Sequence, residues 1–196
     1  MPKIVSEEER ILTREAIYEK TVQLIKEKGI KSITVDDIAG AVGIGKGSFY
    51  VYYPSKEACL FDVIKRCEKE LFSRIEEIMA FEYADKDKAV CLLKEIYTGN
   101  DSLFTSINPT DVEVLLRKLP AKYREMEKEK SENNFQKALE LMKLDNQQME
   151  VVALLTDCLS YAAGNQSYGR DGKDEALNIL INAIADFITN RRDEIG

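Results

Sequence analysis

Between Asp37 and Glu57 the chain carries lysine, hydroxyl and glycine residues but no acidic side chain. Lys46 and Lys56 supply positive charge, and the serines and tyrosines near them supply hydrogen-bond donors. Backbone amides at the start of a helix attract anions, and a glycine lets the backbone approach a neighbour closely. Because the whole chain has a formal net charge of -7, this segment stands out as a surface suited to phosphate.

The helices that position these residues are predicted from local spacing. Thr34 and Asp37 have the capping-box spacing that begins a helix, and Gly43 stands where a left-handed residue would end it. A second short helix is predicted to begin around Gly45. Helix, glycine turn and helix form the outline of a helix-turn-helix. A longer helix that ends at Gly29 is predicted to support it.

The second short helix is predicted to have two different faces. Lys46, Ser48 and Tyr52 point outward, where a partner can reach them. Phe49 and Tyr53 are four residues apart and pack inward. The outward face therefore holds the side chains available for contacts with phosphates and bases.

Three motifs of this region resemble the signature of TetR/AcrR-type transcriptional regulators. They are Thr34-Val-Asp-Asp-Ile-Ala, Gly43-Ile-Gly-Lys-Gly-Ser-Phe-Tyr50 and Tyr53-Pro-Ser-Lys56. The resemblance is specific because several constrained positions occur in one order at one spacing. The chain departs from the family's pattern at Gly45, where the family usually has Ser or Thr, and at Tyr53, where it usually has Phe.

The resemblance implies a set of DNA-binding residues. The residues that would hold phosphates are Thr34, Lys46, Tyr50 and Lys56. Ser48 and Tyr52 are the better candidates to approach base edges, and Lys46 suits either role. The alternative for Tyr50 is packing against the first helix, and the alternative for Lys56 is an ordinary solvated lysine. The complete set is Thr34, Lys46, Gly47, Ser48, Tyr50, Tyr52 and Lys56.

The composition of the 196 residues predicts an all-α protein. Hydrophobic residues make up 44% of the chain, prolines are few, and no alternating strand pattern is bounded by turn residues. Together with the resemblance, this implies an N-terminal helix-turn-helix DNA-binding domain at residues 1–54 and a larger helical ligand-binding and dimerisation domain at 55–196. Residues 1–56 hold nine basic and eight acidic side chains, whereas the rest hold 19 and 27. The acidity therefore belongs to the second domain.

Helices are predicted along the rest of the chain from periodicity and turn signals. One long helix runs from Ser55 to about residue 80. The others are predicted at about 86–98, 109–119, 121–143, 147–166 and 173–192.

Catalysis and metal binding have little support in the composition. The chain has no histidine, and its four cysteines form no C-x-x-C pair, so neither a metal site nor a cofactor is expected. The cysteines are interpreted as small buried hydrophobic residues, with a thiol redox switch as the alternative. No apolar run is long enough to cross a bilayer, and no signal pattern is recognised at the N-terminus, so a cytoplasmic protein is expected.

The last two helices have apolar surfaces too wide for a single contact. One stripe can face the core of the same chain, and the resemblance implies that the other meets a second copy in a homodimer. The alternative is a helical hairpin that is fully buried within a monomer. The predicted interface residues are Leu154, Leu155, Ile179, Ala183 and Phe187.

A small-molecule site is predicted where the resemblance implies a central cavity. Such pockets are mostly apolar with few polar groups, so a small apolar or amphipathic effector is expected. Each candidate is also suited to ordinary core packing. The candidates are Tyr97, Phe104, Tyr123, Phe135, Met142, Cys158, Tyr161 and Asn165.

Together these expectations describe a ligand-responsive repressor. It would bind a near-palindromic double-stranded DNA operator as a dimer and be released by its effector. One alternative is an acidic helical module that keeps the fold but regulates through a protein partner. Another is a helical enzyme that uses carboxylates in the central cavity.

Overall fold

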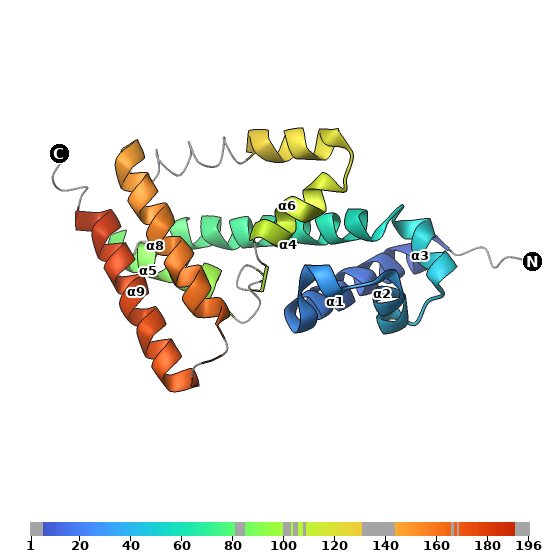
Figure 1. Cartoon of the computed structure of the whole chain (residues 1–196), viewed down its shortest axis with the longest axis horizontal. Helices are drawn as coiled ribbons and strands as arrows, with labels where there is room; N and C mark the ends of the chain where they lie inside the picture. The colour runs from blue at the N-terminus through green and yellow to red at the C-terminus, as the bar shows by residue number, and fades with distance from the viewer. Residues whose placement is uncertain are drawn as a thin grey trace, which may run out of the picture. The chain divides into compact units, whose positions relative to one another are not determined.

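The computed structural model of the chain describes residues 6–80, 85–99, 103, 106–107, 109–130, 144–165, 167 and 169–190. These residues form α-helices joined by turns, and no strand occurs among them, which confirms the all-α prediction. In chain order the helices are α1 (Glu7–Ser32), α2 (Val35–Val42), α3 (Lys46–Tyr52), α4 (Lys56–Ala80), α5 (Asp85–Tyr97), α6 (Pro109–Arg117), α8 (Asn146–Gly164) and α9 (Arg170–Asn190) (Figure 1). Residues 121–130 are also helical, while 131–143 of the predicted helix lie outside the described residues.

The chain packs as two units. The first comprises Met1–Lys69 with Ser106–Ala121, and the second comprises Glu70–Thr105 with Lys122–Gly196. The sequence predicted a boundary between residues 54 and 55, at the turn before α4. Helix α4 runs through both units, and α6 packs with the first one rather than with the helices that follow it.

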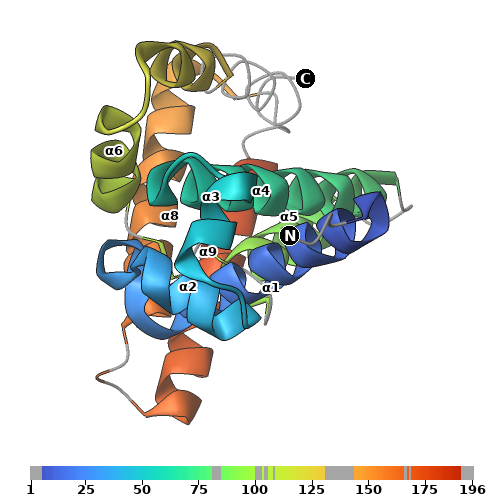
Figure 2. The ribbon, with the colours of Figure 1, turned by 90° about the vertical axis from the view of Figure 1, so that its right-hand side faces the viewer.

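The first unit is built around α1, against which α2 packs, and α2 in turn contacts α3 (Figure 2). Its core consists of apolar side chains supplied by each of these helices and by the start of α4. Ile17, Ile25, Ile38, Phe49 and Leu60 are fully buried. Burial of one such side chain contributes roughly 1.5–3 kcal/mol, so the short helices are stabilised mainly by this shared core.

The sequence predicted that the first helix ends at Gly29, whereas α1 is interrupted at this residue and continues to Ser32. Its backbone has φ 69 and ψ 164, outside the helical region. The chain makes one further turn to Ser32, and this turn directs Ile30 and Ile33 into the core, where both are buried. The glycine therefore redirects the chain and does not simply end the helix.

Polar contacts join α1 to the first half of α4. The Arg66 guanidinium donates to both carboxylate oxygens of Glu15, at 2.7 and 2.5 Å. Its Cζ also lies 3.8 Å from the centre of the Tyr18 ring, within the range of a cation–π contact. The Tyr18 hydroxyl is 3.2 Å from Cys67 Sγ. These contacts join α1 to the part of α4 that belongs to the first unit.

Cys59 lies deeper in the same α1–α4 contact. Its thiol is buried, and burial raises its pKa to about 12. Because the thiolate is the reactive form, Cys59 stays protonated and behaves as a small apolar residue. Cys158, by contrast, is exposed.

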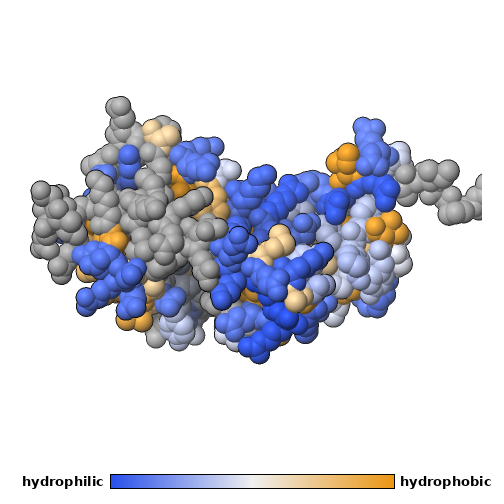
Figure 3. Space-filling view, turned by 90° about the horizontal axis from the view of Figure 1, so that it is seen from above, coloured by the Kyte–Doolittle hydropathy of each residue, from blue (hydrophilic) through white to orange (hydrophobic). Residues whose placement is uncertain are grey.

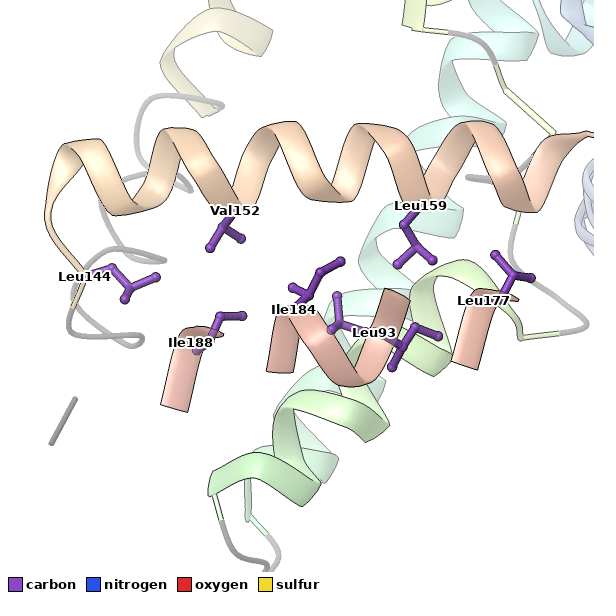
Figure 4. Packing of buried hydrophobic residues seen from close by; sticks show 8 residues of the cluster. Leu93, Leu144, Val152, Leu159, Leu177, Ile184 and Ile188 are labelled. Carbon is purple, nitrogen blue, oxygen red and sulfur yellow. The ribbon is translucent and has the colours of Figure 1, made fainter. Parts of the chain in front are cut away.

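The second unit is centred on α9, which packs against both α5 and α8. Val152 and Leu159 project from α8 toward Ile184 of α9 and Leu93 of α5 (Figure 4). At the edge of this core, Lys86 Nζ and Asp186 Oδ1 form an ion pair at 2.6 Å. One stripe of each of the last two helices therefore faces the core of its own chain, as predicted.

None of the helices in the described part of the chain is long and apolar enough to cross a membrane.

Candidate nucleic-acid interface

The start of α2 is held by the predicted capping box. Thr34 Oγ1 accepts a hydrogen bond from the Asp37 amide at 3.1 Å, and the Thr34 amide donates to Asp37 Oδ2 at 2.7 Å. Lys28 Nζ lies 2.6 Å from the other carboxylate oxygen of Asp37. Lys28 and the Thr34 donors hold the pKa of Asp37 well below its usual range. The hydroxyl of Thr34 thus caps α2, and Thr34 is exposed at the start of this helix.

The turn between α2 and α3 depends on Gly43. Its φ of 76 and ψ of 27 place it in the left-handed region that favours glycine. The amides of Gly43 and Ile44 then donate to carbonyls in the last turn of α2, which satisfies groups that a helix end leaves open. This confirms the predicted turn and fixes the angle at which α3 leaves α2.

Helix α3 begins at Gly45, which supplies no side-chain cap. Phe49 is fully buried and Tyr53 nearly so, as predicted for the inward face. Lys46 and Ser48 are exposed, again as predicted, whereas Tyr52 is only partly exposed. Two residues of the predicted outward face are therefore exposed, and the third is partly buried.

Two further predicted DNA contacts, Tyr50 and Gly47, lie on the exposed surface of α3. The Tyr50 side chain is 49% exposed, and its ring meets Phe49 edge-on, with 5.5 Å between the ring centres. A methyl group placed on Gly47 would have no atom within 4 Å. Packing within the chain therefore does not require glycine at this position, which leaves space for a partner.

Lys46 and Lys56, the two lysines between Asp37 and Glu57, each contact another group of the same chain. Lys46 Nζ lies 2.8 Å from Asp36 Oδ2, and both side chains are more than half exposed. Lys56 Nζ donates to the Ile33 carbonyl at 2.8 Å and is partly buried. Lys56 is thus oriented by the connection between α1 and α2, in contrast to a freely solvated lysine.

Asp36 and Arg14 are residues of this region that the sequence analysis missed. The Arg14 guanidinium carbon lies 5.4 Å from the centre of the Tyr53 ring, and a hydrogen bond to Tyr53 raises the pKa of Arg14. The Tyr53 hydroxyl donates to Asp62 Oδ2 at 2.6 Å. These contacts join residues on different helices, so no spacing rule within one helix would have indicated them.

The predicted effector residues are placed unevenly by the structure. Tyr97 is partly buried, and its hydroxyl interacts with Thr156 of α8. Tyr123 is partly exposed, and so is Asn165, which directly follows α8. Cys158 and Tyr161 are exposed, Tyr161 to 75%. Phe104, Phe135 and Met142 lie outside the described residues.

The predicted dimer residues fall into two groups. Leu154 and Ile179 are 66% and 63% exposed, and Ala183 is also exposed. Leu155 and Phe187 are partly buried and pack against the core of the second unit. The exposed face of α9 carries a shallow hollow lined by Glu175, Asn178, Ile179, Asn182, Ala183 and Asp186.

On the face drawn in Figure 3, the apolar residues that are coloured lie in separate patches. The face drawn in Figure 3 is mostly hydrophilic where it is coloured. Among the described residues, no group of three or more acidic or cysteine side chains is arranged to hold a metal ion.

A capped short helix, a left-handed glycine turn and a second short helix with an exposed basic residue define a helix-turn-helix protein. Residues 17–63 match the model of the family described as "Bacterial regulatory proteins, tetR family". The likeness to this family therefore covers α2, α3 and the adjoining parts of α1 and α4.

Two of the matching relatives are described as HTH-type transcriptional regulators, and each aligns with less than half of the chain. The uncharacterized HTH-type transcriptional regulator YuxN of Bacillus subtilis is 40% identical over 62 residues, which cover 32% of this chain and 21% of YuxN. The HTH-type transcriptional regulator EthR of Mycolicibacterium smegmatis is 37% identical over 78 residues, covering 39% of this chain and 36% of EthR. The chain therefore spans well under half the length of these curated relatives.

A solved structure extends the likeness to most of the chain. The fatty acid degradation regulator FadR from Bacillus halodurans aligns with a TM-score of 0.56 at 18% identity, covering 90% of this chain and 95% of FadR. At this identity the likeness supports the fold alone, and it includes the helices beyond the helix-turn-helix.

Proposed function

We propose that the chain is a ligand-responsive transcriptional regulator that binds double-stranded DNA through α3. The exposed, acid-free surface of α3 within a tetR-family helix-turn-helix is the observation that carries this proposal. In such motifs the second helix enters the major groove and its first residues reach base edges. Lys46 and Ser48 stand at that end of α3 and are exposed.

Contacts with phosphate and contacts with bases have different consequences in this arrangement. The residues proposed to hold phosphates, which position the protein without reading sequence, are Thr34, Lys46, Tyr50 and Lys56. Ser48 and Tyr52 are proposed to approach base edges, which carry the sequence information. Lys56 supports this division because its bond to the Ile33 carbonyl fixes the ammonium group beside the start of α2.

A homodimer is proposed because two recognition helices are needed on a near-palindromic operator. Half-sites separated by one DNA turn lie about 34 Å apart, and a two-fold dimer presents two identical helices at such a spacing. The exposed apolar side chains Leu154 and Ile179 of the last two helices suit the contact between the copies. Residues 1–54 would thus be the DNA-binding domain, and 55–196 the dimerisation and effector domain.

The sign of regulation is proposed to be repression, relieved by a small apolar or amphipathic effector. Tyr97 supports this class of ligand because it is a partly buried aromatic residue with a polar end next to α8. The dimer would have one geometry that binds DNA and one that does not, and the effector needs only to bind the second more tightly than the first. A coupling of about 1 to 3 kcal/mol would change DNA affinity roughly 5- to 150-fold.

A non-catalytic regulator of this kind acts where the DNA is, so the proposal includes a cytoplasmic location. An enzymatic role is not proposed, because the relatives are described as transcriptional regulators.

The proposal is tested by titrating the purified chain against DNA from upstream of its own gene. Fluorescence anisotropy is recorded over a salt series, with a duplex of unrelated sequence as the control. Selective binding of two chains per duplex, with affinity that falls steeply as salt rises, is the expected result. Equal and weak binding to both duplexes, insensitive to salt, would favour an acidic module that regulates through a protein partner.

A further inference from the structure

The first turn of α2 places a carboxylate beside the recognition helix. Asp36 and Asp37 both lie in this turn. Asp37 is engaged by Lys28 and by the Thr34 cap, and its side chain is 29% exposed. The Asp36 side chain is 67% exposed and reaches Lys46, at the start of α3, with 2.8 Å between Oδ2 and Nζ.

We infer that Asp36 competes with DNA phosphates for Lys46. A carboxylate and a phosphate offer an ammonium group the same kind of contact, a charge-assisted hydrogen bond to an anionic oxygen. In the free protein, Asp36 therefore occupies the position on Lys46 that a phosphate oxygen would take. This inference rests on the proposed DNA-binding function, and it assigns Asp36 the role of limiting the affinity for DNA.

The competition has a consequence for the salt dependence of binding. A lysine already neutralised by a carboxylate adds little to the release of counterions from DNA, whereas an unpaired lysine adds about 0.9 to the slope of log affinity against log salt. Since the Asp36–Lys46 pair is exposed, its loss should change affinity by about 1.4- to 5-fold. Asp36 thus lowers the part of the DNA affinity that comes from phosphate contacts and does not depend on the DNA sequence.

The test compares Asp36→Asn with the unaltered chain on the upstream duplex and on the unrelated duplex. We expect binding to both duplexes to tighten by about 1.4- to 5-fold and the salt slope to steepen by about 0.9. The gain should disappear in the double variant Asp36→Asn/Lys46→Ala when it is compared with Lys46→Ala alone. Glu27→Gln is the matched control, because it removes one exposed acid of α1 from the same unit.

Several outcomes would overturn the inference. One is an unchanged affinity for Asp36→Asn while the unaltered chain binds DNA, which would leave the proposed function intact. Another is a gain that persists in the Lys46→Ala background or that Glu27→Gln reproduces, since it would reflect general charge repulsion. A gain confined to the upstream duplex also contradicts it, because every duplex carries phosphates. If the unaltered chain binds neither duplex, the proposed function fails together with the inference.

Discussion

Tyr53 shows how one hydroxyl adds an interaction to the DNA-binding unit. Where TetR-type regulators usually have Phe, this chain has a tyrosine whose hydroxyl donates to Asp62 at 2.6 Å. The ring is buried, and burial together with Asp62 raises the Tyr53 pKa above its usual value. The phenol therefore stays protonated as a donor, and it joins the end of α3 to α4.

Replacement of Tyr53 by Phe should lower stability while keeping the packing of the ring. We expect the free energy of unfolding to fall by about 0.5 to 1.5 kcal/mol, because the Asp62 carboxylate is exposed enough to be hydrated once the bond is lost. Urea denaturation measures the change as a shift of the midpoint at constant slope. Tyr50→Phe, which removes a hydroxyl from a half-exposed ring, should shift stability by less than about 0.5 kcal/mol. Equal shifts in both variants would show that the Asp62 contact contributes nothing.

Ser48 is the residue at which base reading is most directly tested. Ser48→Ala should change the ranking of duplexes that differ at one half-site position, by about 1 to 3 kcal/mol for the base that the hydroxyl contacts. Competition anisotropy with a panel of single-substitution operators measures this ranking. Ser32→Ala, at the exposed end of α1, should leave the ranking unchanged. An equal loss of affinity on every duplex would assign Ser48 to phosphate contact instead.

At the scale of elements, the helix-turn-helix was predictable because its signals are local. The Thr34–Asp37 box and the left-handed glycine are each set by a few neighbouring residues, and the structure confirms both. The Asp36–Lys46 and Lys56–Ile33 contacts were not predictable, because they join residues 10 and 23 positions apart. Such contacts depend on how helices pack, which capping and periodicity do not specify.

Helices α8 and α9 show a related limit of what can be predicted from the sequence. Their bounds were predicted within a few residues, and their double apolar stripes were recognised. Periodicity places residues on a common face but does not say what that face meets. Cys158 and Tyr161 were assigned to a central cavity, yet both are exposed on α8 together with Leu154. At spacings of three and four residues these side chains form one exposed stripe, and their role at an effector site stays a prediction.

The turn that orients α3 should be sensitive to the backbone conformation of Gly43 alone. A methyl group at Gly43 would have no atom within 4 Å, so Gly43→Ala tests only the cost of its positive φ. We expect a loss of about 1 to 2 kcal/mol in unfolding free energy. Gly40→Ala is the matched control, since it adds the same methyl group to open space inside α2 and should stabilise by about 0.5 to 1 kcal/mol. Thermal and urea unfolding measure whether each substitution lowers or raises the free energy of unfolding. A Gly43→Ala variant that is more stable than the unaltered chain would show that the turn does not need the positive φ.

At the scale of the whole molecule, charge and apolar surface are distributed differently along the chain. Residues 57–196 carry 19 basic and 27 acidic side chains, whereas residues 1–56 are nearly balanced. Long-range repulsion from DNA is therefore strongest for the C-terminal part, which favours approach through the N-terminal helices. Leu154 and Tyr161 on α8 and Ile179 on α9 leave large apolar side chains in solvent in the single chain. A second copy would bury them.

The dimer proposal makes Leu154 and Ile179 interdependent with DNA binding. In a two-fold contact each substitution occurs twice, so Leu154→Glu or Ile179→Glu would bury two unpaired carboxylates. We expect the dimer dissociation constant to rise at least about 100-fold, equivalent to roughly 2.7 kcal/mol. Sedimentation velocity should then show monomers, and operator affinity should fall because one recognition helix is lost from each bound unit. Met126→Glu is the control, since Met126 is 65% exposed on the helical segment 121–130 and should leave the dimer intact. If the Leu154 and Ile179 variants remain dimeric, these side chains lie outside the contact and another surface joins the copies.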